Sequence, residues 1–165
     1  MGDVDAMAER VGEPAGFELP LRLLMGFRVL IDDLHTELAR QGHPDARPMH
    51  GFALQAVGRD GTTAAELGRR LQVSKQAAGK TIATLERLGY LERAEDPADA
   101  RRKTVRLTDR GRDLLARSAH IFDRLRRRWA EEVGEDRLRA LEADLRALTP
   151  GDPMRLDAPG WFGTG

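Results

Sequence analysis

Residues 71–111 read LQVSKQAAGKTIATLERLGYLERAEDPADARRKTVRLTDRG, and this stretch decides the fold. Ser74 stands before a run whose apolar residues recur at steps of three and four, so it is expected to cap a helix. Gly89 follows as the expected left-handed terminator of that helix. The segments Tyr90–Ala94 and Lys103–Leu107 then read as two short strands around a charged loop. The stretch therefore predicts a helix followed by a β-hairpin.

A second short helix is expected directly before this one. Thr63 followed by Glu66 fits a capping box, which opens a helix that runs through Leu71. Only Gln72 and Val73 separate it from the helix that Ser74 opens. Two short helices joined by such a turn have the spacing of a helix-turn-helix.

Further helices are expected on both sides of this unit. Apolar residues from Pro20 to Gln41 follow the helical period, and Met49–Val57 offers a short helix. Thr108 is expected to cap a helix of several turns, and the last helix is expected over about Asp136–Leu148. The predicted fold class is therefore mainly α with a small β-hairpin wing.

We expect one folded domain, residues 17–148, between two irregular ends. Residues 1–16 are acidic and have no apolar period, and they are expected to be flexible. Residues 149–165 form a tail rich in Pro and Gly. Whether Trp161 and Phe162 anchor this tail in a groove, or are incidental in an unstructured end, stays open.

Composition excludes several classes of protein. The 27 basic and 27 acidic residues cancel, so any basic patch must be local. The absence of cysteine excludes disulfides, thiolate metal sites and a thiol redox switch. No signal peptide or membrane span is expected, which indicates a soluble, cytoplasmic protein. No nucleophile with a base and an orienting group can be nominated, so neither an enzyme nor a cofactor is expected.

The helix opened by Ser74 has one face suited to reading DNA. Ala78, Thr81, Ile82, Leu85 and Leu88 are expected to face the core. The opposite side carries Gln76, Lys80, Ala83 and Arg87 at steps of four, three and four. Long polar donors that rise from small neighbours suit a major groove, although such a face can also be an ordinary solvated one.

The hairpin adds a second basic element. Between Asp60 and Arg110 the chain has 11 basic and 8 acidic residues, so the excess of charge is positive here and negative elsewhere. Asp99 stands two residues before Arg101, and a carboxylate at that spacing can hold a guanidinium in a fixed direction. An arginine held in this way would be oriented toward a binding partner.

The stretch as a whole resembles the winged helix-turn-helix core of the multiple-antibiotic-resistance regulator (MarR) family. The residues that carry the resemblance are Ser74, the junction LERLGYLER, the wing DPADARR and the helix start LTDRG. The resemblance implies that Asp99 orients Arg101 into the minor groove and that Arg102 and Lys103 contact phosphates. The expected DNA-binding residues are Ser74, Lys75, Gln76, Lys80, Ala83, Arg87, Asp99, Arg101, Arg102 and Lys103.

A homodimer is expected on two grounds. The outer helices carry more apolar surface than one small reading head can cover, and the family resemblance implies a two-fold dimer on a pseudo-palindromic operator. The reading head is placed at about residues 49–107, and the dimerisation elements at about 17–41 and 108–148. The protein is expected to act as a repressor.

The resemblance further implies release from DNA by a small aromatic or phenolic effector. Candidate lining residues are Phe27, Met49, His50 and Phe52, although plain core is the commoner reason for such residues at these positions. A rival function is a winged-helix protein-interaction module without specific DNA binding. AAGKT lacks the first glycine of a phosphate-binding loop and lies inside a predicted helix. The histidines, His35, His43, His50 and His120, are expected to be scattered on the surface, and no metal site is expected.

Overall fold

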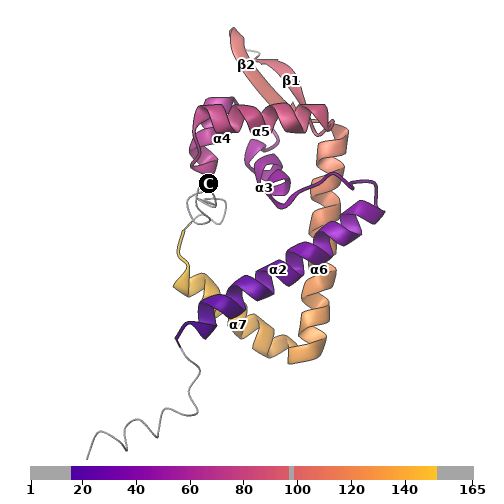
Figure 1. Ribbon diagram of the computed structural model, residues 1–165, viewed down its shortest axis with the longest axis vertical. Coiled ribbons are helices and arrows are strands. Elements are labelled where there is room, and N and C mark those ends of the chain that lie inside the picture. Colours follow the sequence, from indigo (N-terminus) through magenta and orange to yellow (C-terminus); the bar gives the residue numbers. More distant parts are fainter. Residues whose placement is uncertain (1–15, 97–98, 152–165) are drawn as a thin grey trace, which may run out of the picture. The chain divides into compact units, whose positions relative to one another are not determined.

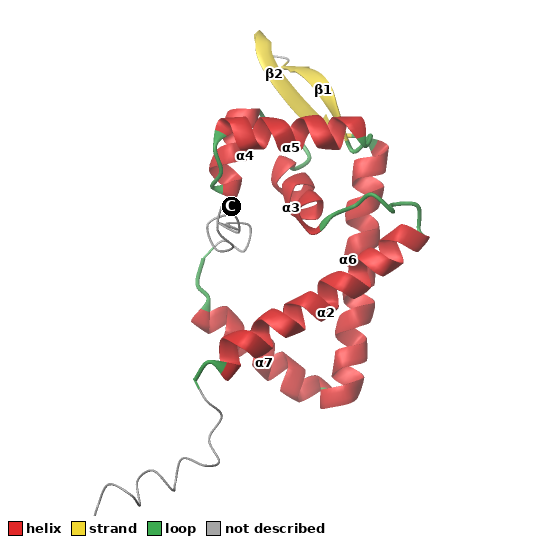
Figure 2. Cartoon of the chain, viewed as in Figure 1, coloured by secondary structure: helices red, strands yellow, loops and turns green. Residues whose placement is uncertain are grey.

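The computed structural model describes residues 16–96 and 99–151, with side chains described except at residues 95, 96 and 99–102. Helices make up most of this part of the chain and one antiparallel hairpin accompanies them (Figures 1 and 2). The elements are α2 (Glu18–Arg40), α3 (Pro48–Val57), α4 (Ala64–Leu71), α5 (Lys75–Arg87), β1 (Leu91–Asp96), β2 (Asp99–Leu107), α6 (Asp109–Val133) and α7 (Glu135–Leu148). The predicted fold class is confirmed, whereas the expectations for residues 1–15 and for Trp161 and Phe162 lie outside the described residues.

The chain divides into two compact units within α2, between Asp33 and Leu34. In the first unit, large apolar side chains are exposed around the helix rather than along one stripe. They are Phe17, Leu19, Leu21, Leu23, Leu24, Met25, Phe27 and Val29. In the second unit, the last turns of α2 bury Leu34 and Leu38. The expected single domain over residues 17–148 stays a prediction.

Helices α4 and α5 begin at the predicted caps. The Thr63 hydroxyl accepts a hydrogen bond from the Glu66 N–H at 3.2 Å, and the Ser74 hydroxyl accepts one from the Ala77 N–H at 3.0 Å. Between the helices Gln72 adopts the left-handed conformation with φ 55°. A cap at each start and a left-handed residue in the turn give the two helices their helix-turn-helix geometry.

The hairpin is longer than the sequence predicts. Strand pairing runs from Leu91 opposite Leu107 to Asp96 opposite Asp99, with an irregularity between Glu95 and Asp96. The predicted ends of the two strands at the charged loop were therefore wrong: β1 continues through Asp96, and β2 already includes Arg101 and Arg102 before the predicted start at Lys103. The extension consists of further backbone pairing, with Glu95 opposite Lys103 and Asp96 opposite Asp99.

The base of the hairpin is fixed to the helices. Thr62 and Val105 exchange both backbone hydrogen bonds at 2.9 Å, so the segment before α4 lies along β2. Leu91, Val105 and Leu107 are buried on the inner side of the hairpin. The wing is therefore anchored at its base.

Helices α6 and α7 are joined by an ion-pair cluster around Arg126. Its guanidinium contacts Glu142 at 2.7 Å and Glu135 at 3.1 Å, and Glu135 also pairs with Arg139 at 2.9 Å. Leu138 is buried at the same junction. These contacts hold the last helix against α6.

Candidate nucleic-acid interface

Helix α5 separates its two faces as predicted. Ala78, Ile82 and Leu85 are buried, and Thr81 and Leu88 are half-buried. The opposite face exposes Gln76, Lys80, Ala83 and Arg87, together with Ser74 and Lys75 at the start of the helix. A Cβ placed on Gly79 would meet nothing within 4 Å, so the surface between the long side chains is low.

The long side chains of this face have no partner within the described part of the protein. None of Lys75, Gln76, Lys80 and Arg87 makes a hydrogen bond or ion pair there. Their donors are therefore available to an external acceptor. Ser74 differs, because its hydroxyl oxygen accepts from Ala77 while its hydroxyl hydrogen remains able to donate.

Other arginines of the basic region are held by the protein itself. Arg70 donates to the Ala56 carbonyl at 2.6 Å and pairs with Glu66 at 2.9 Å. In the hairpin, Arg93 pairs with Glu86 at 3.1 Å, and Arg106 pairs with Glu92 at 2.7 Å. Fewer cationic side chains are therefore available to an external partner than the count of basic residues indicates.

Sequence reasoning missed Arg69 as a candidate. This side chain is exposed at the end of α4 and makes no hydrogen bond or ion pair with the described residues. The signal was present in the sequence, because Glu66 stands four residues before Arg70 and three before Arg69. The i,i+4 pairing ties down Arg70 and leaves Arg69 to face outward.

The wing carries the second group of predicted DNA contacts. Lys103 is exposed on β2, and Thr104 donates its hydroxyl to the Ala94 carbonyl at 2.6 Å across the hairpin. The backbone places Asp99, Arg101 and Arg102 on β2, but their side chains lie outside the described residues. The orienting role of Asp99 toward Arg101 stays a prediction.

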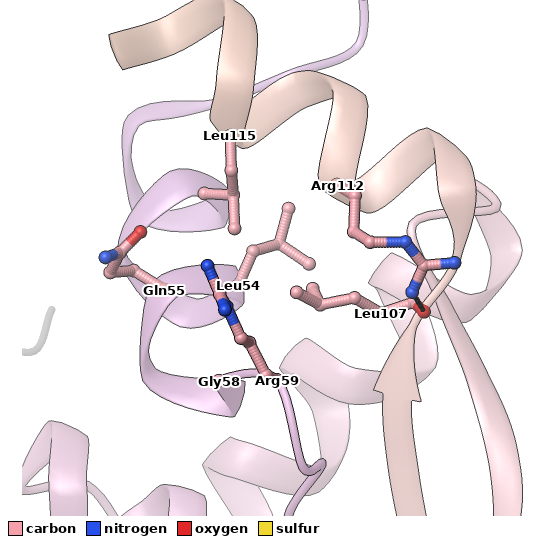
Figure 3. A pocket seen from close by; sticks show the side chains of 7 residues that line it. All are labelled: Leu54, Gln55, Gly58, Arg59, Leu107, Arg112 and Leu115. Carbon is pink, nitrogen blue, oxygen red and sulfur yellow. Dashed lines mark hydrogen bonds between the residues drawn. The ribbon is translucent and has the colours of Figure 1, made fainter.

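A pocket of about 690 Å³ lies where the end of α3, the end of β2 and the start of α6 meet (Figure 3). Its lining residues are Leu54, Gln55, Gly58, Arg59, Leu107, Arg112 and Leu115. Arg112 donates to the Leu107 carbonyl at 2.7 Å and pairs with Asp109. None of the four residues expected to line an effector site contributes to this pocket.

Those four residues lie on two helices. Phe27 is exposed on the first unit, whereas Met49, His50 and Phe52 lie on α3 with Met49 exposed and the other two half-buried. The N–H of Arg47 donates to His50 Nδ1 at 3.2 Å. Burial, Arg47 and His35 lower the pKa of His50. Their role as an effector site stays a prediction.

The expectation that all four histidines lie on the surface was wrong for His43, whose side chain is 2% exposed. It lies in the turn after α2 and contacts the Tyr90 hydroxyl and the Asp113 carboxylate. No periodic pattern reports this burial, because the residue lies in a turn and its partners are 47 and 70 positions away.

A helix-turn-helix with a hairpin wing is a class of nucleic-acid-binding fold. Comparison with known proteins shows which family within this class the chain resembles. The model of the MarR family matches residues 47–102, which cover α3, α4, α5 and most of the wing. A curated relative, the HTH-type transcriptional regulator BilQ of Clostridioides difficile, is 26% identical over 83 residues, or 50% of this chain and 56% of that protein. The chain spans about half the length of the curated relatives it matches.

Solved structures share the same fold. The S. aureus MepR–DNA complex superposes with a TM-score of 0.61 and 22% identity over 77% of this chain and 92% of that one. Ligand-free MarR from E. coli superposes with a TM-score of 0.61 and 21% identity over 84% of this chain and 98% of that one. The resemblance inferred from the sequence is confirmed: residues 47–102 match the model of the MarR family, and the chain shares the winged helix-turn-helix fold of these solved structures.

Proposed function

We propose that the protein is a sequence-specific, double-stranded-DNA-binding regulator that acts as a homodimeric repressor. One observation carries the proposal: Gln76, Lys80 and Arg87 stand exposed on the second helix of a helix-turn-helix without a partner among the described residues. This helix enters the major groove, where amide, ammonium and guanidinium groups read base edges. MepR, which shares the fold, has been solved in complex with DNA.

The remaining contacts position the protein on the duplex. Ser74 and Lys75 lie at the amino end of α5, where a hydroxyl, an ammonium and free backbone N–H groups favour phosphate. Arg69 extends this phosphate-binding edge from α4. Arg101 of the wing enters the minor groove, held by Asp99, and Arg102 and Lys103 contact phosphates beside it.

The apolar surface at the chain's outer helices supports a dimer. The first unit exposes aliphatic and aromatic side chains all round α2, and a helix of that kind is normally covered by another chain. Phe122, Val133, Leu141 and Leu148 add exposed apolar surface on α6 and α7. A two-fold dimer reads a pseudo-palindromic operator with half-sites about one helical turn apart.

We also propose that a small aromatic or phenolic effector releases the operator. Phe27, Met49, His50 and Phe52 remain its candidate contacts, and the effector must bind the DNA-incompetent arrangement more tightly than the competent one. No helix in the described part is long and apolar enough to cross a membrane. We place the protein in the cytoplasm with the DNA and assign it no catalytic activity or cofactor.

Fluorescence anisotropy of the full chain against its own upstream intergenic DNA tests the proposal. A scrambled duplex of equal length is the control, and each titration is repeated across a salt series. Selective binding by two chains per duplex, with affinity that falls steeply with salt, is expected. Equal weak binding to both duplexes would overturn the proposal for that DNA and favour a protein-interaction module.

A matched pair of variants distinguishes the interface from general charge. Lys80→Ala should weaken operator binding, because it removes a donor on the reading face of α5. Arg146→Ala removes the same charge from an exposed position of α7, on the side of the helix away from Leu141 and Leu148, and should leave binding unchanged. Equal losses in the two variants would mean that the whole molecule binds DNA through net charge alone.

A further inference from the structure

His43 connects three elements that are far apart in the sequence. Its Nδ1 lies 3.1 Å from the Tyr90 hydroxyl and its Nε2 lies 2.9 Å from a carboxylate oxygen of Asp113. Both ring nitrogens are thus engaged in a site that solvent barely reaches. His43 lies in the turn after α2, Tyr90 lies between α5 and β1, and Asp113 lies on α6.

The hydrogen bonds in this cluster have a defined direction. Hydrogen bonds from Arg117 and His43 lower the pKa of Asp113, so its carboxylate is ionised and only accepts. In the neutral imidazole, the Nε2 proton therefore points to Asp113, and Nδ1 is left as an acceptor. The Tyr90 hydroxyl then donates to Nδ1. The chain of donors runs from Tyr90 through His43 to Asp113.

Two arginines of α6 hold the turn on either side of His43. Arg117 donates to Asp113 at 2.7 Å and to the Gln41 side chain at 3.1 Å. Arg110 donates to the Gly42 carbonyl at 3.0 Å, and its guanidinium carbon lies 5.0 Å from the centre of the Tyr90 ring. Helix α6 thereby fixes both the turn and the tyrosine.

Tyr90 stands where the recognition helix and the wing diverge. Its N–H donates to the Leu85 carbonyl at 2.9 Å, at the end of α5, and its own carbonyl accepts from the Thr108 N–H at 3.1 Å, before α6. The next residue begins β1. A displacement of Tyr90 would therefore move α5 and the wing together.

We propose that His43 is a positioning residue for DNA binding, which fixes the orientation of α5 and the wing on α6 through Tyr90. This inference rests on the proposed function, because the orientation matters only if α5 and the wing engage DNA together. If these residues served packing alone, apolar side chains of similar volume would fill the same space. Here, instead, a polar chain with one direction joins the turn, the tyrosine and α6.

The test compares operator affinity with stability. Tyr90→Phe removes only the hydroxyl, and it should lower operator affinity by about tenfold, the equivalent of one net buried hydrogen bond. All titrations are made well below the melting temperature, where every variant is fully folded. Ile121→Val is the control, because it alters a buried residue of α6 outside this cluster. It should lower the melting temperature while operator affinity stays unchanged.

His43→Gln, alone and combined with Tyr90→Phe, completes a double-mutant cycle in operator affinity. The loss in the double variant should be clearly smaller than the product of the two single losses, because both remove the same connection. Wild-type affinity in Tyr90→Phe, or fully multiplicative losses, would overturn the inference while DNA binding by the wild type still stood.

Two measurements that need no DNA test the role of His43 independently of the proposed function. Nitrogen NMR of the wild-type histidines should show His43 as the tautomer protonated at Nε2. Hydrogen exchange of Tyr90→Phe should be faster than wild type at backbone amides of α5 and β1, with little change in α7. A tautomer protonated at Nδ1, or unchanged exchange, would overturn the positioning role even if no operator were found.

Discussion

Gly111, in the first turn of α6, lies directly against the backbone carbonyl of Tyr90. A Cβ at position 111 would fall well inside the contact distance of that oxygen. The carbonyl is not free to retreat, because it accepts from the Thr108 N–H at 3.1 Å. The Thr108 hydroxyl in turn donates to the Gly89 carbonyl at 2.6 Å and accepts from the Gly111 N–H at 3.1 Å. The glycine permits the close approach that joins α6 to the base of the wing.

Gly111→Ala should therefore destabilise the protein by about 1–3 kcal/mol, the usual cost of overpacking a filled site. Chemical denaturation monitored by circular dichroism measures this change. Gly79→Ala is the matched control, since position 79 is also helical and has open space for a Cβ. The control should gain up to about 1 kcal/mol from helix propensity. A neutral Gly111→Ala would mean that α6 shifts without cost.

Tyr90 should ionise only at unusually high pH. Burial raises the pKa of its hydroxyl, against the opposing effect of Arg110. It is the one tyrosine of the chain, so the near-ultraviolet absorbance of tyrosinate reports it alone. Since the folded state holds the neutral form, its contribution to stability is complete below the unfolded pKa of about 10 and declines as pH rises above it. The absorbance midpoint should fall on denaturation, and equal midpoints would contradict the assignment.

Gln76 and Lys80 should determine the preference among operator sequences. Replacing either by alanine should cost about 1–3 kcal/mol on operators that carry its preferred base and much less on operators that lack it. Competition titrations with single-base operator variants measure this difference. A uniform loss across all operators would instead make the two side chains phosphate contacts.

Arg101→Ala should weaken binding to every duplex and reduce the slope of log affinity against log salt by about one. Asp99→Ala should produce a milder loss, because Arg101 keeps its charge but is no longer oriented. An unchanged slope in Arg101→Ala would remove this residue from the interface. A neutral Asp99→Ala would leave Asp99 as a turn residue.

The cluster around Arg126 predicts an acid-dependent contribution to stability. Arg126 lowers the pKa of Glu142 below its usual 4.5. The pair therefore stabilises the fold fully above that value and loses its contribution as pH falls through the lowered pKa. Glu142→Gln should melt below wild type at neutral pH by a small margin that vanishes in acid, because the pair is partly exposed. Glu131→Gln, an exposed change on α6, should show no such pH dependence.

The local signals in the sequence predicted the elements well. Thr63, Ser74 and Thr108 each cap the helix they were expected to cap, because a cap is decided by a hydroxyl and the next three residues. The division of α5 into a buried and an exposed face followed from periodicity alone. The same reasoning failed for the extent of the hairpin, since strand pairing depends on a partner that a single strand does not specify.

Local sequence patterns could not predict the buried polar cluster around His43. His43 lies in a turn without a periodic pattern, and its burial arises from Tyr90 and Asp113, which only the tertiary fold brings near. The count of basic residues likewise included Arg70, whose guanidinium is held by Ala56 and Glu66. Which charges face outward depends on contacts between helices rather than on composition.

The length of α5 limits how much sequence one protomer can specify. From Gln76 to Arg87 the helix rises roughly 16 Å at 1.5 Å per residue, and duplex DNA advances about 3.4 Å per base pair. In the proposed function, α5 thus spans no more than about five base pairs of the major groove, and the proposed two-fold dimer no more than about ten. An operator of ten specified positions recurs by chance on the order of once per million base pairs. A genome of a few million base pairs would hold only a handful of such sites, so the proposed dimer would be directed to a small set of them by binding alone.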